Sequence, residues 1–292
     1  MKEWIPLTTE GKSAYTVSGK SFTAVAINTA AKAGEWIKSK LGDYNNLDLK
    51  YSSHDLVTEV DKGSETMIRN LIMTHFPHHS FLGEEGVEAG PEASAEALKE
   101  VRGDEYLWIV DPLDGTTNFV HGFPYFAVSI ALAHNGEVIV GVIYDPIRDE
   151  LFVAEKGKGA YVKGKRMTVS QELKLADGLI ATGFPVDRKV NLPCNLAGIQ
   201  ALAPRVRNIR TAGAAALHLA YVAAGRLTGF WEIGLHPWDI AAGSLMVQEA
   251  GGHITDTAGR PYSLETRHVI ATNGAIHGEL QAVLSEAKAT GL

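Results

Sequence analysis

The sequence predicts a layered protein of the α+β or α/β class, in which helices and strands alternate. Residues 106–110, 126–134 and 137–145 are apolar runs of strand length, and Asn135-Gly136 joins the last two with a strong hairpin signal. After residue 165, strand-length apolar runs alternate with segments of helical periodicity, which is typical of stacked α and β layers. We therefore expect an N-terminal half of residues 1–165 and a C-terminal half of residues 166–292.

In the N-terminal half, helices precede the strands. Residues 22–41 carry apolar side chains at helical spacing after Ser21, and Asp61 is expected to cap a second helix that runs to about His75, before Pro77. Residues 79–86 indicate a short strand and a loop, and residues 86–105 a solvated connector with room for a short helix. The β pattern then occupies residues 106–110, 126–134, 137–145 and 151–170.

The C-terminal half alternates strands with helices. Strands are expected at residues 179–184, 206–211, 227–233, 253–256 and 268–273. Helices are expected at residues 191–204, 212–226 and 238–252, the last ending on Gly251-Gly252 as a C-cap.

Composition excludes several classes of protein. The chain has 292 residues, of which 45% are hydrophobic, so it can bury a sizeable core. A net charge of −7 argues against nucleic-acid binding as the main function, although bound metal ions would let an acidic protein hold phosphate. No run approaches the roughly 18 apolar residues of a membrane span. We therefore expect a soluble, cytoplasmic protein without a membrane partner.

Acidic residues recur beside apolar segments. Each alone could be a helix cap, a turn former or a solvated charge. Gathered in one cleft, several carboxylates would repel one another, and a bound divalent cation would relieve the repulsion. Oxygen ligands suit Mg²⁺ or Mn²⁺, and the usual zinc spacings are absent from the sequence. The acids in question are Asp55, Asp61, Glu84, Glu85, Asp111, Asp114 and Asp239.

The stretch WIVDPLDGTTNF, residues 108–119, concentrates this chemistry. Pro112 keeps Asp111 extended, and a turn through Leu113 would bring Asp114 and the Leu113 carbonyl into the same space. Gly115 lets the backbone approach a ligand closely. A helix that begins at Thr116 would offer free N–H groups to a phosphate. The stretch therefore predicts metal ligands on one side and an anion site on the other.

Other patterns have plainer interpretations. Gly159 to Lys165 reads GxxxxGK, but Arg166 follows in place of Ser or Thr and the context is β–β, so a surface hairpin is expected instead of a nucleotide-binding loop. His78-His79 are expected in a loop, and Trp231 and Trp238 in the core.

Three motifs resemble the hallmarks of the inositol monophosphatase family, a group of lithium-sensitive, Mg²⁺-dependent phosphatases. They are GEE at 83–85, VDPLDGTTNFVHGFPYFAVSIAL at 110–132 and WDIAAGSLMVQEAGG at 238–252. The resemblance runs in family order from about residue 22 to residue 275. It implies an alternating α-β-α-β-α sandwich of the sugar-phosphatase type, and hydrolysis of a phosphomonoester by a metal-activated water.

The resemblance also assigns roles to residues at matching positions. The metal ligands are Glu84, Asp111, the Leu113 carbonyl, Asp114 and Asp239. Water is oriented by Glu84 and by Thr116 with Asp61, and phosphate is bound by Gly115 and Thr116. The substrate contacts are Asp114, Gly213, Ala214, Ala215, Glu232 and Asp239. The supporting residues are Lys50, Asp55 and Glu85.

The substrate is less sharply defined than the chemistry. The spacing from Glu232 to Asp239 favours an inositol monophosphate or similar polyol phosphate, but Ala214 stands where members often have Thr or Ser. Fructose 1,6-bisphosphate, histidinol phosphate and 3′-phosphoadenosine compounds remain alternatives. Loss of an acidic ligand would support a different class, a non-catalytic accessory that binds RNA or protein, but every expected acid is present. The resemblance further implies Mg²⁺ with Mn²⁺ as a substitute, inhibition by Li⁺, and a homodimer.

Overall fold

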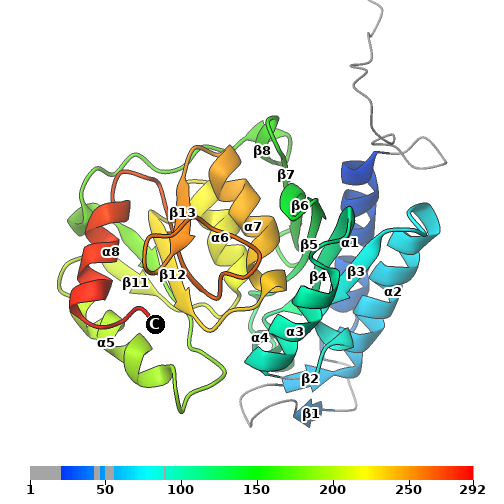
Figure 1. The fold of residues 1–292 in the computed structure, drawn as a ribbon, viewed down its shortest axis with the longest axis horizontal. Helices are drawn as coiled ribbons and strands as arrows, with labels where there is room; N and C mark the ends of the chain where they lie inside the picture. The colour runs from blue at the N-terminus through cyan, green and yellow to red at the C-terminus, as the bar shows by residue number, and fades with distance from the viewer. Residues whose placement is uncertain (1–20, 43–46, 50–55, 89, 292) are drawn as a thin grey trace, which may run out of the picture.

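Two β-sheets with helices between and outside them form the frame of the computed structural model (Figure 1). The structure describes residues 21–42, 47–49, 56–88 and 90–291. The layers alternate as α-β-α-β-α, so the predicted architecture is confirmed.

The seven-stranded sheet has the order β3-β4-β5-β6-β7-β8-β9, with β3 parallel to β4 and every other pair antiparallel. The hairpin between β5 and β6 turns at Asn135 and Gly136, whose φ values of 50° and 79° suit a type I′ turn, as expected. Residues 157–166 contain the hairpin of β8 and β9, which agrees with the surface-hairpin interpretation. The strands are β3 (Ser80–Gly83), β4 (Tyr106–Asp114), β5 (Ala127–His134), β6 (Glu137–Asp145), β7 (Glu150–Glu155), β8 (Gly159–Val162) and β9 (Lys165–Arg166).

Helices α1 (Phe22–Ser39) and α2 (Glu59–His75) cover one face of this sheet. Successive side chains of β4 point to opposite faces, so Trp108 packs with α1 and α2 while Ile109 packs toward the second sheet. The cap of α2 differs from the expectation. Thr58 is the N-cap, and Asp61 is the third helical residue, whose carboxylate accepts from the backbone N–H of Thr58 in a capping box.

The five-stranded sheet has the order β11-β10-β12-β14-β13, with β10, β11 and β12 parallel. Its strands are β10 (Leu179–Ala181), β11 (Asn208–Arg210), β12 (Gly229–Ile233), β13 (His253–Asp256) and β14 (His268–Thr272). β10 and β11 are shorter than the runs 179–184 and 206–211 predict. The paired residues of β10 end at Ala181, and the Thr182 N–H still donates to the Arg210 carbonyl. Beyond it, the Gly183 carbonyl accepts from the side-chain amide of Asn195 at 2.9 Å instead of from a strand.

Helices α6 (Ala215–Ala223) and α7 (Pro237–Glu249) lie between the two sheets. Helices α5 (Leu192–Leu202) and α8 (His277–Glu286) cover the outer face of the five-stranded sheet. Phe230 of β12 packs inward, and Trp231 packs toward α5 and α8, so this tryptophan is a core residue as expected.

Six further elements complete the described part of the chain. They are the paired strands β1 (Leu47–Leu49) and β2 (Leu56–Thr58), the 3₁₀ turns η1 (Glu84–Gly86) and η2 (Leu175–Asp177), and the helices α3 (Pro91–Val101) and α4 (Thr116–Val120). No helix in the described part of the chain combines the length and apolar character needed to cross a membrane.

Candidate active site

A pocket of about 300 Å³ opens where β4 ends and where α4, α6 and α7 begin. Three helix N-termini therefore meet at one place, and their exposed N–H groups favour negative charge there. The pocket is lined by residues of both halves of the chain. The predicted site residues among its lining are Glu84, Asp111, Leu113, Asp114, Gly115, Thr116, Gly213, Ala215, Glu232 and Asp239.

The end of β4 supplies the first group of these residues. The sequence predicted an extended chain up to Asp111 and a turn through Leu113, but the strand continues to Asp114 with an irregular register between Asp111 and Asp114. The backbone N–H of Leu113 donates to Oδ1 of Asp111 at 2.9 Å, which fixes this carboxylate beside the irregularity. A β-bulge re-aims side chains in this way without ending the strand.

Gly115 follows in a conformation that other residues rarely adopt. Its φ is 97°, and a Cβ atom there would lie 3.0 Å from the Tyr125 carbonyl oxygen. The chain can then turn sharply from β4 into α4, which begins at Thr116 as expected.

Thr116 and Asp61 form the predicted pair. The Thr116 hydroxyl donates to Oδ1 of Asp61 at 2.8 Å, with the Leu113 carbonyl as an alternative acceptor at 3.1 Å. The other oxygen of Asp61 accepts from both the N–H and the hydroxyl of Thr58. Burial raises the pKa of Asp61, and the hydrogen bonds from Thr58 and Thr116 oppose that rise.

Asp114 connects the two halves of the chain. Its two oxygens accept from the backbone N–H groups of Ala215 and Ala216, at 3.2 and 2.7 Å. These are the first N–H groups of α6, so the carboxylate caps this helix from 101 residues away in sequence. Burial raises the pKa of Asp114 to about 7, against the effect of these hydrogen bonds.

Asp239 lies in the first turn of α7. One of its oxygens accepts from the backbone N–H of His236 at 2.7 Å, so the capping role and a ligand role are compatible. Burial raises its pKa, and Asp114 and Glu84 raise it further. The ring of Trp238 is buried and stacks on His236 with centroids 4.9 Å apart, in agreement with a packing role.

The acids of the pocket repel one another, and this repulsion raises their pKa values. Burial raises the pKa of Asp111 well above its ordinary range, and Glu84, Asp114 and Asp239 each add to the rise. In the described residues, no three His, Cys, Asp or Glu side chains form a closed cluster of metal-ligand geometry. The acids instead line one pocket and raise one another's pKa values. Their oxygen donors fit a hard cation such as Mg²⁺ or Mn²⁺, which would relieve the repulsion.

Another side of the pocket is formed by β12 and by the segment before α6. Glu232 is buried, which raises its pKa well above the ordinary range, with smaller contributions from Asp239 and Asp114. A Cβ atom on Gly183 would lie 2.1 Å from a carboxylate oxygen of Glu232, so a side chain at position 183 would displace this carboxylate.

Ala214 differs from the role that the sequence suggested. Gly213 and Ala215 line the pocket, but the Ala214 side chain is 1% exposed and packs in the core. Ala214 is the N-cap residue of α6 and has no side chain able to cap it. A hydroxyl at this position would supply a cap, and Asp114 provides that hydrogen bonding instead.

The supporting residues are only partly described. Lys50 and Asp55 lie outside the described residues. The backbone N–H of Glu85 donates to Oε2 of Glu65 at 2.7 Å, which fixes the turn that carries Glu84. The sequence did not lead us to predict Glu65 and Asn118 as residues of the site. Glu65 lies one helical turn after Asp61, and Asn118 two residues after Thr116, and these spacings were the available signals.

Comparison with known proteins gives relatives in both sequence and structure. Residues 19–289 match the sequence model of the inositol monophosphatase family. The chain is 44% identical to a protein named Nus factor SuhB of Pseudomonas aeruginosa, over 85% of this chain and 90% of the relative. It is 43% identical to inositol monophosphatase 2 of Solanum lycopersicum, over 92% of this chain and all of the relative.

Solved structures show the same fold. The crystal structure of the extragenic suppressor protein suhB from Bartonella henselae has a TM-score of 0.81 and 42% identity, and covers 90% of this chain and 98% of its own. The chain therefore belongs to the inositol monophosphatase family.

Proposed function

We propose that this protein is a Mg²⁺-dependent phosphatase that releases phosphate from an inositol monophosphate or a closely related polyol phosphate. The observation that carries the proposal is the meeting of Glu84, Asp111, Asp114 and Asp239 at one pocket, with raised pKa values for the three aspartates. Oxygen donors and unrelieved negative charge together fit a divalent cation.

The chain's own residues define the chemistry around that cation. When bound, Mg²⁺ stabilises charge on the phosphate oxygens and lowers the pKa of a water ligand. Carboxylates of Glu84, Asp111, Asp114 and Asp239, with the Leu113 carbonyl, are the groups we propose to hold it. Mn²⁺ is the expected substitute and Li⁺ the expected inhibitor.

Thr116 is proposed to orient the attacking water. Its hydroxyl has one proton and two acceptors, the Leu113 carbonyl and Asp61. If the Leu113 carbonyl were to hold the metal ion, Asp61 would be the acceptor that remains for the Thr116 proton. The lone pairs of Thr116 can then accept from water, and Glu84 is placed in the same pocket as the group that takes up the water's proton.

The leaving alcohol is proposed to face Glu232, Gly213 and Ala215. Glu232 is buried and its raised pKa favours the protonated form, which can both donate to and accept from a substrate hydroxyl. Such a neutral donor and acceptor suits the hydroxyl groups of a polyol.

A phosphate-release panel tests the proposal. Metal-stripped protein would be supplied with Mg²⁺ and offered inositol 1-phosphate, fructose 1,6-bisphosphate, histidinol phosphate and 3′-phosphoadenosine 5′-phosphate in turn. We expect the highest kcat/KM for inositol 1-phosphate. Release from none of the four would overturn the phosphatase proposal, and a clear preference for another compound would overturn the substrate assignment.

A second candidate function follows from the relatives named Nus factor SuhB. In that case the chain would act by binding partners in a Nus complex, and turnover would be dispensable. Asp111→Asn separates the two functions, because a binding role survives this substitution and a phosphatase role does not. The presence of all four acids around the pocket favours the enzyme.

A further inference from the structure

We propose that Asn118 is a positioning residue, which fixes the segment Ala212–Ala215 at the leaving-group side of the pocket. Its effect on turnover rests on the proposed phosphatase function, whereas the contact itself can be tested without any substrate. Asn118 lies on α4, two residues after Thr116, and lines the pocket.

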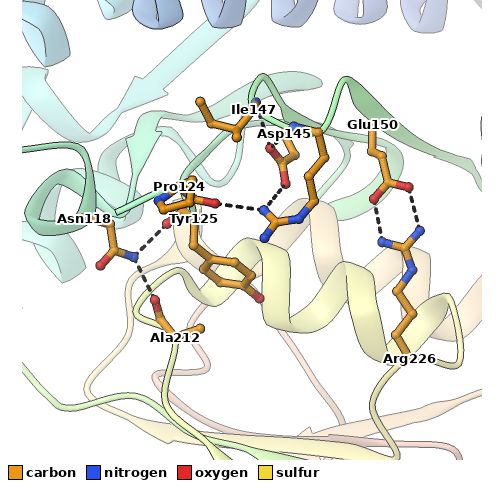
Figure 2. Close-up of polar contacts among 9 residues, drawn as sticks. Asn118, Pro124, Tyr125, Asp145, Ile147, Glu150, Ala212 and Arg226 are labelled. Carbon is orange, nitrogen blue, oxygen red and sulfur yellow. Dashed lines mark hydrogen bonds and ion pairs between the residues drawn. The ribbon is translucent and has the colours of Figure 1, made fainter. Parts of the chain in front are cut away.

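The side-chain amide of Asn118 bridges two backbone segments. Its Nδ2 atom donates to the carbonyl oxygens of Tyr125 and Ala212, each at 2.7 Å (Figure 2). A third carbonyl, that of Gly213, lies at 3.3 Å. An amide nitrogen carries two protons, so the two short bonds use the full donor capacity of this group. The bond to Ala212 joins residues 94 positions apart in sequence.

The bridged segment leads directly to the N–H groups that hold Asp114, one of the proposed metal ligands. Gly213 has a φ of 82°, and a Cβ atom there would lie 3.2 Å from Nδ2 of Asn118, so the backbone approaches the amide closely. The next N–H groups, of Ala215 and Ala216, donate to Asp114. The segment is therefore attached at its start by Asn118 and at its end by Asp114.

A second set of contacts holds the Tyr125 side of the bridge. Pro124, the neighbour of Tyr125, accepts a 2.9 Å hydrogen bond from Nη1 of Arg148. The same nitrogen donates to the fully buried carboxylate of Asp145 at 3.0 Å, and Asp145 also accepts from the backbone N–H of Ile147 (Figure 2). The Tyr125 carbonyl, one acceptor of Asn118, is thus held close to the end of β6. If the Asn118 bonds were lost, we therefore expect the Ala212–Ala215 segment to move and the Tyr125 segment to stay in place.

The same region offers a matched control. Arg226, beyond the C-terminal end of α6, forms a bidentate pair with Glu150 of β7 at 2.5 and 2.7 Å (Figure 2). This pair also connects α6 to the seven-stranded sheet, but it is at the opposite end of the helix from residues 212–216. Arg226→Gln therefore tests general loosening of α6 without touching the segment.

The experiment compares Asn118→Ala, Asn118→Asp and Arg226→Gln with the unmodified chain. Asn118→Asp keeps the shape of the side chain but places carboxylate oxygens against carbonyl oxygens. Hydrogen exchange of the Ala215 and Ala216 amides is measured first, since it needs no activity. KM and kcat are then measured for inositol 1-phosphate and for phenyl phosphate, which has no polyol to contact the segment.

We expect both Asn118 variants to accelerate exchange at Ala215 and Ala216 by about tenfold, the effect of one or two lost hydrogen bonds. KM for inositol 1-phosphate should rise by a similar factor, with a smaller rise for phenyl phosphate, and Arg226→Gln should change none of these values. Arg148→Gln is a milder second variant with the same expected direction.

Unchanged exchange at these amides in the Asn118 variants would overturn the proposal, whatever the activity. An equal KM rise for both substrates, or the same rise in Arg226→Gln, would reduce Asn118 to a residue of general stability. If the unmodified chain releases no phosphate but Asn118→Ala accelerates exchange, the contact stands and the phosphatase function fails.

Discussion

The hydroxyl of Thr116 donates a 2.8 Å hydrogen bond to Asp61, a residue 55 positions earlier in the chain. The bond connects the start of α4 to the first turn of α2, whose N-cap Thr58 donates to the other oxygen of the same carboxylate. Asp61 thereby closes a helix cap and orients a pocket hydroxyl at once. The capping carboxylate of α2 is therefore also part of the group that we propose to bind water.

Removal of this hydroxyl should slow turnover. We expect Thr116→Ala to lower kcat by roughly a hundredfold or more, because positioned groups of this kind contribute about 10²–10⁴ to rate. Thr116→Ser should keep most of the activity, since it retains the hydroxyl. Thr66→Ala, on an exposed face of α2, is the control. Equal kcat values for Thr116→Ala and the unmodified chain would remove Thr116 from the mechanism.

Gly115 should be intolerant of a side chain for two reasons that can be separated. Gly115→Ala combines a left-handed φ of 97° with a Cβ contact of 3.0 Å to the Tyr125 carbonyl oxygen. Gly122→Ala has the same handedness, at a φ of 67°, but no atom within 4 Å of its Cβ. We expect a loss of about 1 kcal/mol for Gly122→Ala and about 2–3 kcal/mol for Gly115→Ala in urea unfolding. Equal losses in the free energy of unfolding would show that the contact with the Tyr125 carbonyl oxygen does not destabilise Gly115→Ala.

The sequence predicted those parts of the fold that local chemistry determines. Asn135-Gly136 specifies a type I′ hairpin by itself, and alternate side chains of β4 separate onto two faces because the strand is buried on both. Motif resemblance predicted that Asp111, Asp114, Glu232 and Asp239 share one site, and all four line the same pocket.

The parts that sequence could not predict depend on long-range contacts. The continuation of β4 to Asp114 requires Ala127 as its partner, and no local signal distinguishes this irregular strand from a turn. Asp61 resembles an N-cap in sequence, but Thr58 takes that place because its backbone N–H and hydroxyl reach the carboxylate. Asn118 finds its acceptor 94 residues away, which no pattern near it reveals.

Acid should destabilise the fold through buried histidines. Burial lowers the pKa of His218 to about 3, below the ordinary value near 6.5, so the folded chain favours the neutral ring. This contribution is complete above pH 6.5 and is lost as the pH falls from 6.5 toward 3. At pH 5 the loss is about 2 kcal/mol relative to pH 7.5.

Urea unfolding of His218→Gln at both pH values checks this expectation, because the variant lacks the titrating group and should show a correspondingly smaller change between them. His78→Gln, on an exposed loop, is the control and should follow the unmodified chain. A pH dependence that is identical in all three proteins would assign the acid sensitivity to other groups.

Asp111→Asn should separate two effects of the acidic pocket: repulsion between carboxylates, which destabilises the metal-free protein, and stabilisation by bound Mg²⁺. Asparagine keeps an oxygen that can accept from the Leu113 N–H but removes one of the repelling carboxylates. Without metal, we expect the variant to be at least as stable as the unmodified chain. With Mg²⁺ at about 100 times the dissociation constant, the unmodified chain should gain nearly 3 kcal/mol and the variant far less. Thermal unfolding with and without Mg²⁺ measures both, with the surface variant Asp177→Asn as control.

The central claim is that these carboxylates hold a metal ion for phosphate hydrolysis. It is tested most directly by phosphate release from inositol 1-phosphate as Mg²⁺ is added back to metal-stripped protein. We predict no release before addition, saturable release with increasing Mg²⁺, and no release by folded Asp111→Asn at any Mg²⁺ concentration. Release that does not depend on Mg²⁺, or equal release by Asp111→Asn, would contradict the account.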